Sequence, residues 1–217
     1  MLTCSLGTSP AQPLKILCLG AHSDDIEIGC GGTILKLLAA HPASEVRWVV
    51  FSGSTRRAEE AQAGAAQFLR NRPNGTIDVQ NFRDGFFPYE GIAIKEYFES
   101  LKSGGVPDII FTHYRHDRHQ DHRTISDLTW NTFRNHLIWE YEIPKFDGDF
   151  GSPNLFVALD DDLVEQKCKS VMDVFVSQQQ KHWLTEELLR SVLRIRGMEA
   201  GGDTRYAEAF YTRKVVL

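Results

Sequence analysis

The sequence has no long apolar run, few cysteines and no excess of basic residues. None of its hydrophobic stretches reaches the ~20 residues that a membrane-spanning helix requires, so we expect no stable membrane insertion. The segment from Met1 to Pro13 has no basic residue ahead of an apolar run, which argues against a secretory signal. The four cysteines form no C-x-x-C pair and no regular spacing. We therefore expect reduced thiols in a cytoplasmic protein.

The charge balance is slightly acidic. The 217 residues include 24 Lys and Arg against 29 Asp and Glu, which gives a formal net charge of −5. Because an excess of negative charge repels phosphate backbones, this balance argues against a nucleic-acid partner. With 42% hydrophobic and 11% aromatic residues, the chain has enough apolar side chains for a sizeable core.

Buried-strand patterns and helical patterns alternate along the chain. Strands are expected over 14–20, 45–51, 76–82, 107–112, 139–143, 155–159 and 209–217. Helices are expected over 33–41, 56–69, 90–102, 123–134, 162–177 and 185–195. This alternation predicts an α/β fold, a Rossmann-like three-layer sandwich with a mostly parallel sheet. No linker or repeat divides the chain, so we expect one domain over 1–217, in which 1–13 is a flexible lead.

Polar residues gather where two of the expected strands end. One group, Ala21 to Asp25, follows the first strand, and the other, His113 to His122, follows the fourth and holds four of the eight histidines. In α/β proteins, functional groups collect beyond the carboxyl ends of the strands. Imidazole and carboxylate are ligands of catalytic zinc, where three protein groups leave a fourth position for water. The two segments therefore predict a metal site.

The spacing within the two segments suggests a ligand set. His22 and Asp25 are three residues apart, so one tight turn can direct both toward one ion. His119 and His122 have the same spacing, and either could supply a second nitrogen. Asp24 would then lie beside the metal, free to take a proton from its water. The alternative is that the two aspartates cap the following helix, although a cap needs only one carboxylate.

These motifs resemble those of a known family. The segments Ala21 to Asp25 and Gly31 to Thr33 are similar to the A-H-P-D-D and G-G-T signatures of the zinc-dependent PIG-L/LmbE-like de-N-acetylases. His119 to His122 is similar to the H-x-D-H signature of the same family. Two weaker similarities are Arg57 to Ala61 and Tyr206 to Phe210, so the resemblance extends over nearly the whole chain.

The resemblance implies a role for individual residues. It implies three zinc ligands, which are His22, Asp25 and His122. Asp24 would be the general base, and His119 would stabilise the oxyanion or act as the acid, with Asp121 tuning it. Zinc-activated water would remove the acetyl group of an N-acetylated amino sugar. A site of two histidines and one carboxylate also accepts iron, so the identity of the metal stays open.

Two further residues are candidates for binding the substrate. Arg57 could reach a hydroxyl or phosphate, or it could form a surface ion pair with Glu60. By the resemblance, Glu208 lies near the site; otherwise it is an ordinary surface glutamate. The sequence departs from the family pattern at Ser23, where proline is usual. Similar families often form trimers or hexamers, which makes a homo-oligomer our expectation.

Other functions remain open at this stage. The chain could hydrolyse another amide or a phosphoester, and a two-metal phosphoesterase would bind about two ions per chain. It could also be a sugar-binding module that contains a metal without catalysing a reaction. A nucleotide site at Gly29 to Gly32 is disfavoured, because the G-x-G-x-x-G spacing is absent and nearby carboxylates would repel a pyrophosphate.

Overall fold

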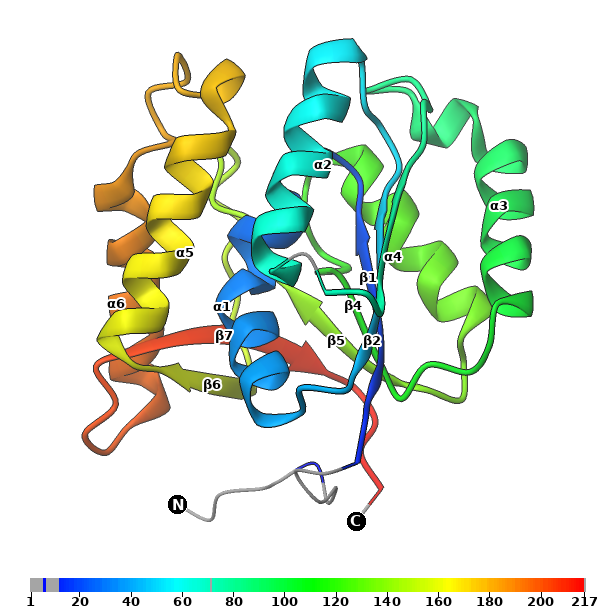
Figure 1. The fold of residues 1–217 in the computed structure, drawn as a ribbon. Helices are drawn as coiled ribbons and strands as arrows, with labels where there is room; N and C mark the ends of the chain where they lie inside the picture. The colour runs from blue at the N-terminus through cyan, green and yellow to red at the C-terminus, as the bar shows by residue number, and fades with distance from the viewer. Residues whose placement is uncertain (1–5, 7–11, 71, 217) are drawn as a thin grey trace.

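Strands and helices alternate through most of the chain (Figure 1). The computed structural model describes residue 6, residues 12–70 and residues 72–216. Most of the predicted lead over 1–13, Cys4 included, lies outside these residues. The strands are β1 (Lys15–Gly20), β2 (Glu45–Val50), β3 (Gly75–Val79), β4 (Ile109–His113), β5 (Leu137–Tyr141), β6 (Leu155–Leu159) and β7 (Tyr206–Thr212). The α-helices are α1 (Asp25–Ala40), α2 (Thr55–Leu69), α3 (Gly91–Ser103), α4 (Gln120–Thr132), α5 (Asp161–Val174) and α6 (Glu186–Ala200). Two short 3-10 helices are η1 (Phe87–Tyr89) and η2 (Val176–Gln178).

The strands form one seven-stranded sheet in the order β3-β2-β1-β4-β5-β7-β6. From β3 to β5 all neighbours are parallel, whereas β7 pairs antiparallel with both β5 and β6. The expected α/β fold with a mostly parallel sheet is therefore confirmed. Because β1 and β4 are neighbours, with Cys18 opposite Phe111, the segments that follow these two strands lie side by side.

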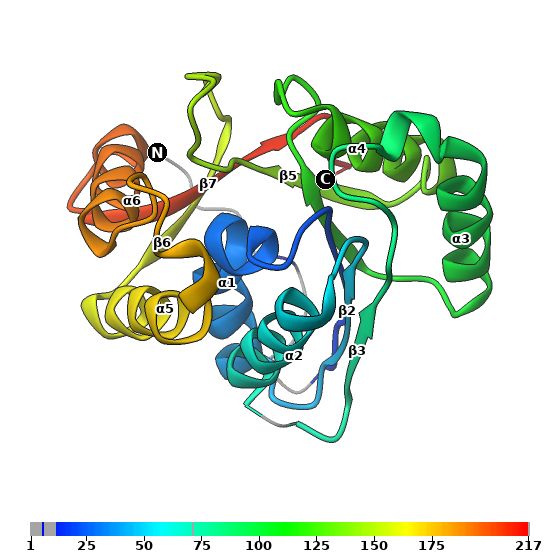
Figure 2. The ribbon, with the colours of Figure 1, turned by 90° about the horizontal axis from the view of Figure 1, so that it is seen from above.

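Helices cover both faces of the sheet (Figure 2). Helices α1, α2, α5 and α6 pack on one face, where Ile16 and Cys18 of β1 point. Helices α3 and α4 pack on the other face, against Leu17 and Leu19. Both faces of β1 are thus buried, which explains why its sequence is an almost unbroken apolar run. Among the described residues, no helix combines the length and the apolar composition that crossing a membrane requires.

The cysteines agree with the expectation of reduced thiols wherever the structure describes them. Cys18, Cys30 and Cys168 are buried and free.

Helix α1 begins at Asp25, well before the expected start at Thr33. Glycine weakens helix propensity, so the sequence pattern becomes helical only after the glycine-rich segment. In the folded chain a Cβ atom on Gly29 would lie 2.2 Å from the ring of Tyr141. Glycine here therefore lets the helix approach β5 closely. The helix can then begin at Asp25, ahead of the glycines, so that Asp25 lies in its first turn. Helix α4 also begins earlier than expected, at Gln120.

Candidate metal centre

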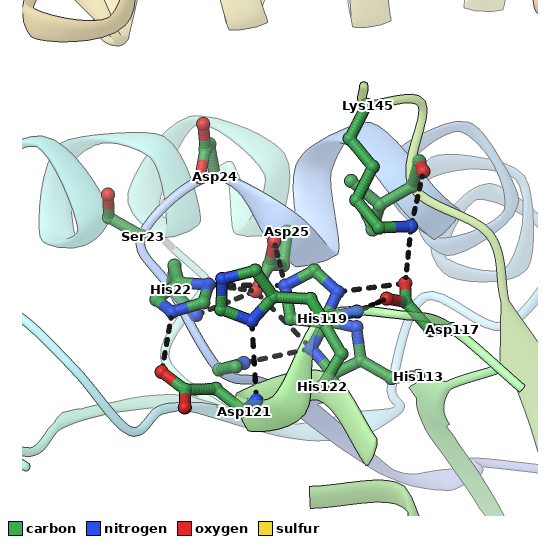
Figure 3. A network of polar contacts seen from close by, with 12 residues as sticks. His22, Ser23, Asp24, Asp25, His113, Asp117, His119, Asp121, His122 and Lys145 are labelled. Carbon is green, nitrogen blue, oxygen red and sulfur yellow. Dashed lines mark hydrogen bonds and ion pairs between the residues drawn. The ribbon is translucent and has the colours of Figure 1, made fainter. Parts of the chain in front are cut away.

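The two polar segments meet beyond the ends of β1 and β4 (Figure 3). The backbone N–H of Ala21 donates to Nε2 of His113 over 2.9 Å. Nδ1 of His22 lies 3.2 Å from Nε2 of His122. Residues about 100 positions apart in the sequence therefore form one buried cluster of imidazoles and carboxylates.

Three side chains in this cluster bring their donor atoms together, with each oxygen of Asp25 facing one histidine. Besides the contact between the two imidazoles, Asp25 Oδ2 lies 3.4 Å from His22 Nδ1, and Asp25 Oδ1 lies 3.5 Å from His122 Nε2. Tetrahedral zinc with ligands at about 2.0–2.1 Å separates those ligands by about 3.3 Å. The spacing of these donors therefore fits a zinc ion, and all three side chains are buried.

Asp25 is held in place by the turn that precedes α1. Its Oδ2 accepts a hydrogen bond from the backbone N–H of His22 over 2.6 Å. Burial alone would raise the pKa of Asp25, but the nearby His122, His113 and His22 hold it well below its usual range. Asp25 is thus ionised and available as a ligand.

Asp24 lies in a different environment although it is adjacent. It occupies the N-cap position of α1, yet within the described part of the chain its side chain makes no capping hydrogen bond. Asp24 is buried, and its Oδ1 lies 3.7 Å from Nη2 of Arg57. Burial and the negative charge of Asp25 raise the pKa of Asp24, against the opposing effect of Arg57. The expected pair of carboxylates therefore does not serve to cap the helix.

His119 completes a group of three imidazoles. Nitrogen atoms of His22, His119 and His122 all lie within 4.8 Å of one another. His119 is the N-cap of α4, and its Nδ1 accepts the backbone N–H of Asp121. Burial and the charge of His22 lower the pKa of His119. Because His119 lies here, either His119 or His122 is within reach of one ion.

Asp121 acts on two histidines. Its charge raises the pKa of His119, against the stronger lowering effect of burial, and its carboxylate also lies 3.2 Å from Nε2 of His22. Its two oxygens also accept the backbone N–H groups of Gly85 and Phe87, over 2.6 and 3.2 Å. These backbone donors, from the segment between β3 and α3, hold the Asp121 carboxylate in contact with His22.

Three residues of the cluster were not assigned a role from the sequence. Asp117 Oδ2 is 2.9 Å from Nδ1 of His122, and Asp84 Oδ1 is 3.2 Å from Nε2 of His22. His113, the last residue of β4, stacks on His122 with ring centroids 4.0 Å apart. Nε2 of His113 accepts the Ala21 N–H, although Asp25, His113 and His122 also hold possible ligand atoms within 4.8 Å of one another. Asp84 follows the third strand, so the strand-end argument could have identified it.

Arg57 lies at the site. Its Nε donates to Ser23 Oγ over 3.1 Å, and its Nη1 lies 2.9 Å from Asp84 Oδ2. The alternative pairing with Glu60 is not formed, because Arg57 turns toward Asp24 and Asp84 while Glu60 pairs with Arg56. Ser23, found where the family usually has proline, thus supplies an acceptor for Arg57.

Glu208 does not belong to the cluster, and its assignment as a substrate-binding residue is corrected. It is buried inside the protein, where its carboxylate accepts the backbone N–H groups of Gly32 and Thr33 and pairs with Lys167 Nζ at 2.5 Å. Lys167 also donates to the carbonyl of Ile28. Because these contacts occupy both carboxylate oxygens, Glu208 secures the middle of α1 and is not available to a substrate.

Solved structures share this fold. The N,N'-diacetylchitobiose deacetylase of Pyrococcus horikoshii aligns with a TM-score of 0.72 and 25% identity, over 96% of this chain and 87% of that one. The 4-carboxy-2-hydroxymuconate hydratase GalB of Pseudomonas putida has a TM-score of 0.70 and 16% identity, over 94% and 98% of the two chains. The A40926 pseudoaglycone deacetylase has a TM-score of 0.69 and 17% identity, over 93% and 97%. At these lower identities the last two show a common fold only.

A family model also matches the sequence directly. The model is described as PIG-L, GlcNAc-PI de-N-acetylase, and it matches residues 17–133, which is more than half of the chain. The matched region includes both segments that build the cluster of imidazoles and carboxylates. On this match the chain belongs to the PIG-L family.

Proposed function

We propose that this chain is a zinc-dependent hydrolase that removes the acetyl group from an N-acetylated amino sugar or sugar conjugate. The observation that carries the proposal is the convergence of the side chains of His22, Asp25 and His122. Asp24, the residue before Asp25, interacts with this group through its charge. Membership of the PIG-L family supports the same chemistry. So does the similarity to a diacetylchitobiose deacetylase.

The donor set suits a divalent cation. Two imidazole nitrogens and one carboxylate leave a position open for water and substrate, as in catalytic zinc sites. A cation bound here would lower the pKa of its water and polarise the acetyl carbonyl. Zinc is proposed over iron because the spacing of the donors matches a tetrahedron, although the same ligand types also accept iron.

Asp24 is proposed as the general base. Burial raises its pKa above that of an exposed aspartate, which makes it a stronger base. It takes the proton of the attacking water and returns it to the nitrogen of the substrate as the C–N bond breaks. The products are acetate and a free amine.

His119 is proposed to stabilise the oxyanion. Its Nδ1 accepts a backbone N–H, so the proton of the neutral ring lies on Nε2 and can be donated. Because its pKa is lowered, His119 is neutral at physiological pH. This favours hydrogen bonding to the developing oxyanion over proton transfer, and leaves Asp24 as the proton donor to the amine.

The test is a screen of N-acetylated sugars, free, nucleotide-linked and lipid-linked, assayed for released acetate with zinc-loaded and iron-loaded protein. We expect acetate from at least one class of sugar, and loss of that activity on chelation. Metal-loaded protein that binds a sugar but releases no acetate would identify a binding module. A product formed by addition of water without release of acetate would indicate a hydratase.

A cytoplasmic location and a homo-oligomeric state stay predictions.

A further inference from the structure

The loop between β5 and β6 directs one lysine into the candidate metal centre (Figure 3). Nζ of Lys145 lies 3.0 Å from Oδ2 of Asp117, and its side chain is only 10% exposed. Lysine is rarely buried unless it is paired, so this position requires a compensating contact. Asp117 and Asp149, at 3.0 and 2.5 Å, provide that contact.

Asp117 connects this lysine to a proposed metal ligand. Its Oδ2 is shared between Lys145 Nζ and Nδ1 of His122, which lies 2.9 Å away. Its Oδ1 accepts the backbone N–H of His119 over 2.7 Å. The donors around Asp117 therefore fix the direction of its carboxylate, and the carboxylate fixes the ring of His122.

A second contact anchors the same loop to the same segment. Oδ2 of Asp149 accepts the backbone N–H of Arg118 over 2.7 Å, and Asp149 also binds Lys145. The loop is thus attached to the residues just before α4 at two points, one through each aspartate. Lys145 is the cation common to both.

We propose that Lys145 is a positioning residue of the metal centre, which holds Asp117 so that His122 presents Nε2 to the cation. The inference rests on the ligand set of the proposed function and adds a residue from a different loop. A carboxylate on the far nitrogen of a histidine ligand sets its tautomer and orientation. Without Lys145, the buried Asp117 loses its cationic partner, and we expect its carboxylate to turn away and release Nδ1 of His122.

The zinc dissociation constant tests this role directly, by competition with a chromophoric chelator. We expect Lys145→Met to weaken zinc binding about tenfold or more, the range typical of residues that orient a metal ligand. Lys145→Arg should restore most of the affinity, because arginine supplies the cation. The matched control is Lys169→Met on α5, which removes an exposed lysine that pairs with Asp173 and should leave zinc affinity unchanged.

Kinetics and folding provide independent readouts. With the best substrate from the acetate screen, Lys145→Met should lower kcat with little change in KM, because the change disturbs the metal and not the substrate contacts. Circular dichroism identifies any loss of fold, and Lys145→Gln, which keeps a hydrogen-bond donor, replaces the methionine variant if that one unfolds.

Two results would overturn the inference. If the folded methionine or glutamine variant binds zinc within twofold of the wild type, or more tightly, Lys145 serves only to tether the loop. If the wild type itself binds no zinc, the positioning role and the proposed function fail together. A wild type that binds zinc but releases no acetate would contradict the proposed function. The zinc affinities of the Lys145 variants would still test the positioning role.

Discussion

Two adjacent aspartates acquire different properties from their surroundings. Asp25 faces three imidazoles, which hold its pKa well below the usual range in spite of burial. Asp24 instead lies near Arg57, at a buried position where burial and the charge of Asp25 raise its pKa. Environments that separate two pKa values in this way assign one carboxylate to binding the metal and the other to proton transfer.

Replacing Asp24 separates these two roles. We expect Asp24→Asn to lower kcat by about 100-fold or more, because general bases contribute about 10²–10⁴-fold, while the zinc dissociation constant stays within a few-fold. Acetate release and chelator competition on the same preparation measure both quantities. The exposed Asp173→Asn is the control. Loss of zinc from Asp24→Asn would show that Asp24 is itself a ligand.

Zinc binding should release a proton from His22. In the metal-free protein, burial opposes the charge on this ring, but Asp121, Asp25 and Asp84 raise its pKa well above the ordinary value of about 6.5. The ring is therefore charged at pH 7 and must lose its Nδ1 proton to bind a metal.

Calorimetry in buffers of different ionisation enthalpy measures this release. We expect about one proton per zinc at pH 7, with apparent affinity falling about tenfold per pH unit below the pKa of His22 and levelling above it. Binding with no proton release would mean that His22 is already neutral or is not a ligand.

Sequence spacing predicted which candidate residues lie close together. His22, Asp24 and Asp25 share one turn, and the H-x-D-H segment opens a helix, as the structure has them. The contact of Asp121 with His22 was not predicted, because it depends on backbone donors of the segment after β3. No sequence pattern pointed to Lys145, since only the folded loop brings it to Asp117.

At the level of elements, the glycines of α1 control how closely that helix packs on the sheet. We expect Gly29→Ala to destabilise the protein by about 1–3 kcal/mol, because its new Cβ would overlap the ring of Tyr141. Gly91→Ala is the matched control, since a Cβ there meets nothing within 4 Å. Urea unfolding measures both variants. Equal stability of the two would show that the approach of α1 to β5 tolerates a methyl group.

Most elements were predictable because their signals are local. Strands β1, β2 and β4 are buried on both faces, which gives continuous apolar runs between turn residues. The placement of β7 between β5 and β6 was not predictable, because antiparallel pairing of distant segments depends on which edge is left open. The early start of α1 was missed because tertiary packing there outweighs the low helix propensity of glycine.

In the whole molecule, the fold brings the site residues together, and the donor atoms of their side chains determine the chemistry. Segments that follow β1, β3, β4 and β5 all reach the site, so seven strands support a cluster of a few side chains. A hydratase and two deacetylases share this fold, and the fold alone therefore does not decide the reaction. The proposed function rests on the converging donors and on the family match, not on the fold.

The central claim is the position of the metal, and anomalous diffraction at the zinc edge from zinc-loaded crystals tests it most directly. We predict one ion per chain, at about 2.0–2.2 Å from Nδ1 of His22, a carboxylate oxygen of Asp25 and Nε2 of His122. An ion bound instead by His22, Asp84 and Asp121, or no anomalous peak among these side chains, would contradict the account.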